Sequence, residues 1–225
     1  MISHVATGLV AIDVEHGLIS AITAHKAPRD PEAAPGVDVG GWLVLPAMAE
    51  PHAHLDKALT AELVPNPKGD LMGAINAWIA AAGAGEITHE GIVERAAAAM
   101  DLLLVHGVTA VRSHVNVIET IGASAVRAVK EAAARFDGLL DIQLVALCAS
   151  PMTGTAGAGT RRALAEAIEA GVDMVGGCPH LDPDGPGSIT VAIDAATEAG
   201  IGIDLHVDEM LDPTMLTLRD YARQV

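Results

Sequence analysis

Apolar runs alternate with amphipathic stretches along most of the chain, in a unit of about thirty residues, the length of a strand–helix module. Strand-like apolar runs fall at residues 108–117, 139–148, 172–178 and 201–207. Each run follows a stretch with helical periodicity, at residues 88–106, 123–136, 160–170 and 188–199. Glycines directly after three of these stretches are typical helix stops, and the stretch 123–136 has a weaker stop at Gly138. The pattern predicts four helix–strand units in succession.

A fifth apolar run, at residues 42–50, leads directly into the motif Pro51-His52-Ala53-His54-Leu55-Asp56. Its apolarity on both faces is typical of a strand in a parallel sheet covered by helices. Residues 1–45 instead show short apolar runs broken by turn residues, which indicate a small β-subdomain. We therefore expect a β-subdomain over 1–45 and a helix–strand domain over 46–225. A last helix should begin at Asp212-Pro213.

Alternating strands and helices at this spacing indicate an α/β protein with a parallel sheet and right-handed crossovers. Five strands are enough for a doubly wound sheet, and too few to close an eight-stranded barrel. No G-x-G-x-x-G follows the first strand, and no G-x-x-x-x-G-K occurs in the sequence. Dinucleotide-binding and P-loop folds are therefore disfavoured.

Composition narrows the class of function. The formal charge is -16, and the chain has one Phe, one Tyr and two Trp. A surface of this charge repels a phosphate backbone, and few aromatic side chains are available to stack on bases, so we expect no nucleic-acid partner. The N-terminal residues lack a basic start, and no apolar run reaches membrane-spanning length, so we expect a cytoplasmic protein with no membrane partner. Cys148 and Cys178 suit reduced, buried thiols.

Candidate chemistry gathers at strand ends. His52 and His54 stand at i and i+2, so on a strand both imidazoles face the same side and can bind one metal ion. An isolated H-x-H is more often an ordinary polar pair. Here His206 closes another strand-like run, at the sheet edge where α/β sites are built, and Glu209 follows it. Three neutral imidazoles suit one Zn2+ or Fe2+, and Glu209 could carry a proton beside the ion or remain a solvated loop carboxylate.

These motifs, together with Arg112-Ser113-His114-Val115-Asn116 and His206-Val207-Asp208-Glu209, resemble the cytosine deaminase branch of the amidohydrolase superfamily over nearly the whole chain. The resemblance implies a (β/α)8 TIM barrel, present here through about strand five, with a small N-terminal β-sandwich. It also implies one divalent metal held by His52, His54 and His206, with Glu209 as the catalytic proton shuttle. The family's strand-eight Asp ligand and strand-six His would lie beyond Val225.

Other positions bear on the substrate and the number of metal ions. The resemblance implies a Gln at the end of strand three that holds pyrimidines, and this chain has Ala149 there, which leaves cytosine itself open. Strand four offers no lysine for a second metal. No C-x-x-C occurs, which excludes the other class of zinc base deaminases. His114 and His180 are candidate substrate-binding residues, with satisfied structural polar groups as the alternative. Arg112 could instead be tied to a structural carboxylate.

The expected function is hydrolytic deamination of a cytosine-like nitrogen heterocycle, in which a metal-activated water attacks the amino-bearing carbon. Two alternatives stay open. One is hydrolysis of an N-substituted amino-triazine or a cyclic amide by an enzyme of the same superfamily. The other is a truncated, non-catalytic half barrel. The expected partner is a small heterocyclic substrate, and the chain could form a homo-oligomer.

Overall fold

A computed structural model describes residues 8–25 and 36–225 of the chain. The chain divides into two compact units, Met1–Pro46 and Ala47–Val225. In the first unit, β1 (Val10–Glu15) and β2 (Leu18–Ala24) form an antiparallel hairpin. Its two-residue turn places His16 and Gly17 at φ 53° and 78°. Positive φ at both turn residues matches the right-handed twist of a hairpin. A sandwich over residues 1–45 stays a prediction.

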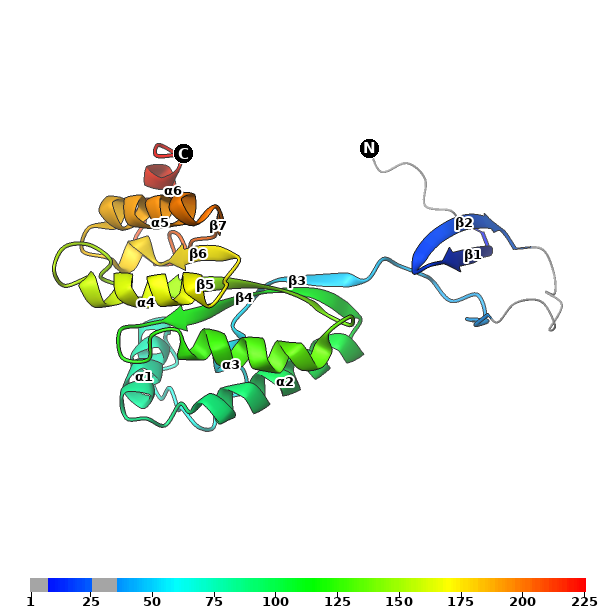
Figure 1. Ribbon diagram of the computed structural model, residues 1–225, viewed down its shortest axis with the longest axis horizontal. Helices are drawn as coiled ribbons and strands as arrows, with labels where there is room; N and C mark the ends of the chain where they lie inside the picture. The colour runs from blue at the N-terminus through cyan, green and yellow to red at the C-terminus, as the bar shows by residue number, and fades with distance from the viewer. Residues whose placement is uncertain (1–7, 26–35) are drawn as a thin grey trace. The chain divides into compact units, whose positions relative to one another are not determined.

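The second unit is built on a five-stranded parallel sheet whose strands lie side by side in chain order (Figure 1). The strands are β3 (Met48–Ala53), β4 (Val108–Val117), β5 (Asp141–Cys148), β6 (Met174–Gly177) and β7 (Gly202–Ile203). Ladder bonds continue beyond β7, from the Asp204 amide to the Val175 carbonyl and from the His206 amide to the Gly177 carbonyl. The predicted parallel α/β fold is confirmed, with a partial barrel of five consecutive strands.

Helices connect the strands as crossovers. They are α1 (Leu71–Gly83), α2 (His89–Val105), α3 (Ser124–Ala133), α4 (Ala158–Glu169), α5 (Gly185–Ala199) and α6 (Thr217–Tyr221), with single 3₁₀ turns at Leu55–Lys57, Ala134–Phe136 and Pro179–Leu181. In Figure 1, α2 and α3 lie along the green part of the sheet, and α4 and α5 along its yellow and orange part. Three helices start at a side-chain cap, provided by Asp70, Thr88 and Asp184. Such caps satisfy amide groups that the first turn leaves free.

Strand β4 has one apolar face and one polar face. On β4, Val111, Val115 and Val117 are buried in the core beneath the helices. The alternate positions carry Arg112 and His114. Because side chains alternate along a strand, these polar residues share the face opposite the helix layer. The polar side chains of β4 therefore lie on the inner face of the sheet, and its apolar side chains pack against the helices on the outer face.

Three elements differ from the sequence prediction. The first strand begins at Met48, where pairing with Val108 starts, so residues 42–47 are not part of it. Helix α1 was not predicted. The last helix begins at Thr217, because the Asp208 carboxylate accepts a hydrogen bond from the Thr217 amide, whereas Asp212 only bonds within the turn that holds Thr214.

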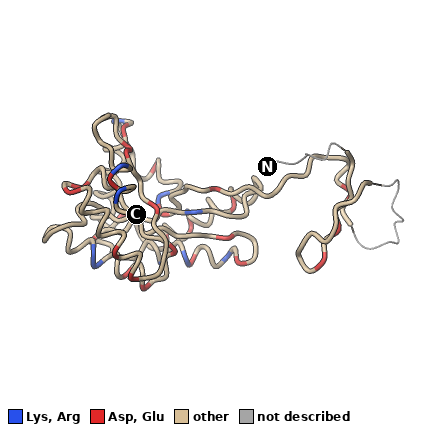
Figure 2. Tube along the Cα trace, turned by 90° about the horizontal axis from the view of Figure 1, so that it is seen from above, with Lys and Arg blue, Asp and Glu red and all other residues tan. Residues whose placement is uncertain are grey.

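Charge is spread over the second unit. Figure 2 shows basic positions interspersed with acidic ones along its trace. Among the described residues, none of the helices has both the length and the apolarity needed to cross a membrane. The absence of a nucleic-acid partner stays a prediction.

Candidate metal centre

Three histidines from the two outer strands of the sheet meet at its carboxyl edge. His52 lies within β3, His54 follows it directly, and His206 extends the ladder of β7. One nitrogen of each ring lies within 4.8 Å of the others. Neighbouring strands are about 4.8 Å apart, so in a flat sheet β3 and β7 would be separated by about 19 Å. The sheet must therefore curve as a barrel wall does.

The spacing of the ring nitrogens fits a metal ion. Nε2 of His54 and Nε2 of His206 are 3.4 Å apart. Two nitrogens that each lie about 2.0–2.1 Å from one tetrahedral ion are separated by about 3.4 Å. Nδ1 of His54 lies 3.1 Å from the carbonyl oxygen of His114, so Nδ1 carries the proton and Nε2 offers its lone pair. The donor set, imidazole nitrogens only, suits Zn2+ or Fe2+.

Burial and neighbouring charges favour the neutral form of two of these imidazoles, His54 and His206. Burial, followed by the positive charge of Lys57, lowers the pKa of His54 to about 3. Burial and the neighbouring rings of His114 and His52 lower the pKa of His206 to about 4. A protonated imidazole cannot bind a metal ion, so both pKa shifts favour the ligating form at neutral pH.

The candidate substrate-binding histidines lie next to the three-histidine cluster but in different settings. His114 is fully buried, and its ring centroid is 4.4 Å from that of His52 and 4.7 Å from that of His206. His180 follows β6 and is 4% exposed. Its Nδ1 lies 3.1 Å from the carbonyl oxygen of His206, and its buried Nε2 has no hydrogen-bond partner among the described residues.

Two carboxylates follow His206, and they have different surroundings. Asp208 has φ 55° and accepts hydrogen bonds from Thr217 and the Leu218 amide. Burial opposes its ionisation, but these bonds outweigh burial and hold the pKa of Asp208 below its usual value. Glu209 is exposed and carries none of these loop contacts. Asp208 therefore anchors the loop, and a catalytic role for Glu209 stays a prediction.

Sequence reasoning missed a contact between a lysine and the first ligand pair. Lys57 donates a 2.7 Å hydrogen bond to Oδ1 of Asn116 and lies 3.3 Å from Nδ1 of His54. Its other neighbour is the fully buried Asp56, 3.6 Å away. Asn116 stands two residues after His114, so strand alternation was the available signal that it faces the site.

Both cysteines are free, and Cys148 is buried, as predicted. Burial raises the pKa of each thiol to about 12, and the charge of Glu209 adds to this for Cys178. A thiol with this pKa stays protonated and is a poor nucleophile. The cysteines therefore contribute packing near the site.

Comparison with known proteins gives relatives of one kind. No protein-family model matches the chain. A crystal structure of 5-methylcytosine deaminase from Klebsiella pneumoniae is 32% identical with a TM-score of 0.84, covering 96% of this chain and 52% of that protein. A pterin deaminase from Rhizobium rhizogenes is 28% identical over 229 residues, which is 97% of this chain and 49% of that protein.

The chain belongs to the amidohydrolase superfamily. A third relative of this superfamily, N-isopropylammelide isopropylaminohydrolase from Burkholderia multivorans, is 25% identical with a TM-score of 0.76, covering 96% of this chain and 53% of that protein. The chain thus spans about half the length of the relatives it matches. The resemblance to cytosine deaminase-like amidohydrolases is confirmed.

Proposed function

We propose that this chain is the metal-binding portion of a hydrolase that removes ammonia from an amino-bearing carbon of a nitrogen heterocycle. The observation that carries the proposal is the convergence of three imidazoles from β3 and β7, within 4.8 Å, at the carboxyl edge of the sheet. Relatives named as deaminases and as an aminohydrolase support the reaction class. Parallel α/β barrels place their active sites at this edge.

In this proposal, His52, His54 and His206 hold one divalent ion, Zn2+ or Fe2+. Such an ion supplies Lewis-acid activation of water. The oxygen of water bonds to the ring carbon, and the bond from that carbon to the amino nitrogen breaks. Glu209 takes a proton from the water at its carboxylate and delivers it to the amino nitrogen, so that the nitrogen leaves as ammonia.

Recognition of the heterocycle falls to polar groups beside the cluster. Nε2 of His180 is buried and unpartnered within the described part of the chain, so it is suited to a hydrogen bond with a ring substituent. His114, which is buried beside the ring of His52, is the second candidate for a contact with the heterocycle. A cytosine-like base is the leading substrate, supported by the 5-methylcytosine deaminase relative. Ala149, directly after β5, cannot donate or accept a side-chain hydrogen bond, which leaves cytosine itself open as the substrate.

A second reaction of the same kind has its own support. Two relatives are named for removal of an isopropylamino group from N-isopropylammelide. If this chain acts in that way, the leaving group is an alkylamine. The same residues keep their roles, because only the substituent on the departing nitrogen changes. Product analysis separates the two reactions.

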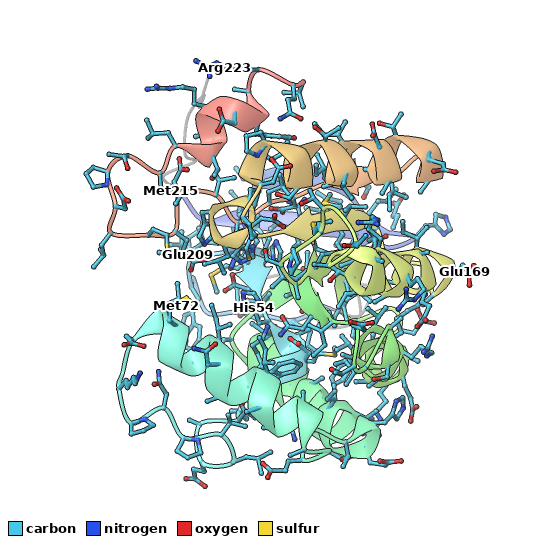
Figure 3. All side chains as sticks on the ribbon, turned by 90° about the vertical axis from the view of Figure 1, so that its left-hand side faces the viewer. His54, Met72, Glu169, Glu209, Met215 and Arg223 are labelled. Carbon is cyan, nitrogen blue, oxygen red and sulfur yellow. The ribbon has the colours of Figure 1, made fainter. Side chains whose placement is uncertain are left out.

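The test is an assay of the purified protein, loaded with Zn2+ or Fe2+, for ammonia and alkylamine release from pyrimidines, pterins and aminotriazines. Glu209→Gln should lower kcat about 100-fold or more while metal content is unchanged. Glu169→Gln, on the far side of the domain in Figure 3, is the matched control and should keep full activity. Bound metal without any amine release would contradict the proposal and favour a non-catalytic half barrel.

We also propose that the protein is cytoplasmic and forms a homo-oligomer. The metal ion is either Zn2+ or Fe2+. The two free thiols suit a reducing compartment. Metal analysis of protein purified without added metal, with size-exclusion chromatography coupled to light scattering, addresses the last two points.

A further inference from the structure

A polar network lies beneath the three histidines and crosses the concave side of the sheet. Nη1 of Arg112 donates a 2.8 Å hydrogen bond to Oδ2 of Asp204, and its Nε and Nη2 donate to Oε1 of Gln143 at 3.2 and 3.0 Å. Oδ1 of Asp204 lies 3.4 Å from Nε2 of His114. The network therefore joins β4, β5 and the extension of β7, although two strands separate β4 from β7 in the sheet.

His114 is the residue through which this network reaches the three-histidine cluster. Its ring lies 4.4, 5.5 and 4.7 Å, centroid to centroid, from those of His52, His54 and His206. Its carbonyl oxygen accepts the Nδ1 proton of His54. One fully buried residue thus limits where all three rings can lie.

Asp204 links His114 to the strand that carries the third histidine. It stands two residues before His206, and ladder bonds hold both backbone amides against β6. Strand alternation therefore directs both side chains into the barrel interior. The side chains of Asp204 and Arg112 are 25% and 34% exposed, so this ion pair is shielded more than a surface pair and constrains geometry. Loss of the carboxylate would leave Arg112 without its charged partner, with only the hydrogen bonds to Gln143 to hold it.

We propose that Asp204 is a positioning residue for the metal centre: it holds His114, and through it the three histidines, without itself contacting the ion. The inference rests on the proposed metal site. Outer contacts of this kind orient the ligands, and their removal typically lowers metal affinity by about 10–100-fold. The sequence left a structural carboxylate open as the partner of Arg112, and Asp204 is the carboxylate that it contacts.

The test is calorimetric titration of the metal-free, purified protein with Zn2+, and with Co2+ followed by its visible absorption spectrum. Asp204→Asn should weaken affinity by about 10–100-fold and alter the Co2+ spectrum, because the ligand geometry changes. Glu94→Gln removes an exposed ion pair of similar length, 2.8 Å to Arg135, and should change neither reading. Thermal unfolding of the metal-free variants separates lost positioning from lost folding.

Arg112→Gln is the second variant if Asp204→Asn does not fold, and it should weaken Zn2+ binding in the same direction. Unchanged affinity and an unchanged Co2+ spectrum in the folded variant would overturn the inference, as would a wild-type protein that binds no Zn2+. A wild type that binds Zn2+ but releases no amine would instead overturn the proposed reaction. The affinities would still decide the role of Asp204.

Discussion

At the scale of single residues, the site depends on imidazoles that the fold keeps neutral. His54 and His206 have pKa values near 3 and 4, against 6.5 in an unfolded chain, chiefly because burial penalises the charged ring. The same burial that prepares the rings for a metal ion makes the metal-free protein sensitive to acid.

This sensitivity gives a prediction with a definite sign. Between pH 6.5 and about 4, the unfolded chain binds protons at His54 and His206 that the folded, metal-free chain does not. The free energy of unfolding should therefore fall as pH is lowered through this window, and these histidines should have no effect above it. Urea unfolding of chelator-treated protein at pH 7 and pH 5 measures the difference. The double variant His54→Gln, His206→Gln should show a weaker pH dependence; an equal dependence would refute the explanation.

The sequence predicted the convergence of the three histidines where strand alternation fixes the direction of a side chain. The pattern was enough to predict that three rings converge: His52 and His54 stand at i and i+2, and His206 stands at a strand end. In the structure, one nitrogen of each ring lies within 4.8 Å of the others. Asp204 was missed although the same alternation joins it to His206. Its partner is 92 residues away in sequence, and no local pattern indicates that contact.

At the scale of elements, caps and pairing partners decide boundaries. The strand predicted at 108–117 matches β4, because apolar positions under the helix layer repeat regularly along it. The run at 42–47 is as apolar, but parallel pairing with β4 begins only at Met48. Helix α1 escaped prediction because its Ala-rich sequence has apolar residues on all sides and a Gly at position 73. These boundaries therefore depend on tertiary contacts, which the periodicity of the sequence does not show.

One cap can be tested directly. The Thr88 hydroxyl accepts a hydrogen bond from the Gly91 amide at the start of α2, the helix that packs against α3 and β4. Thr88→Ala should lower the free energy of unfolding by about 1 kcal/mol. Thr197→Ala, at an exposed position inside α5, is the matched control and should change it by less than about 0.5 kcal/mol. Equal losses in chemical denaturation would show that Thr88 does not act as a cap.

At the scale of the whole molecule, the second unit is a curved sheet of five parallel strands with the three-histidine cluster at one edge. The alternation of strands and helices predicted this order of strands, because right-handed crossovers leave few other topologies. The periodicity alone could not predict the curvature, which was implied by the family resemblance and follows from the meeting of β3 and the extension of β7.

A bound ion should stabilise the folded state, because the unfolded chain has no preformed site. At a free Zn2+ concentration 100 times the dissociation constant, the free energy of unfolding should rise by about 2.7 kcal/mol. Thermal unfolding with Zn2+ and with a chelator measures this change. His206→Ala should abolish the response, and a response of full size in that variant would show that Zn2+ binds elsewhere.

His54 and His206 are separated by 152 residues along the chain, and this separation bears on the rates of folding and unfolding. Because a site built from ligands this remote forms only when the two outer strands of the sheet have met, we expect the ion to bind late in folding. Interactions that form after the rate-limiting barrier slow unfolding and leave the folding rate nearly unchanged. A bound metal ion would then slow the unfolding of the sheet and leave its folding rate nearly unchanged.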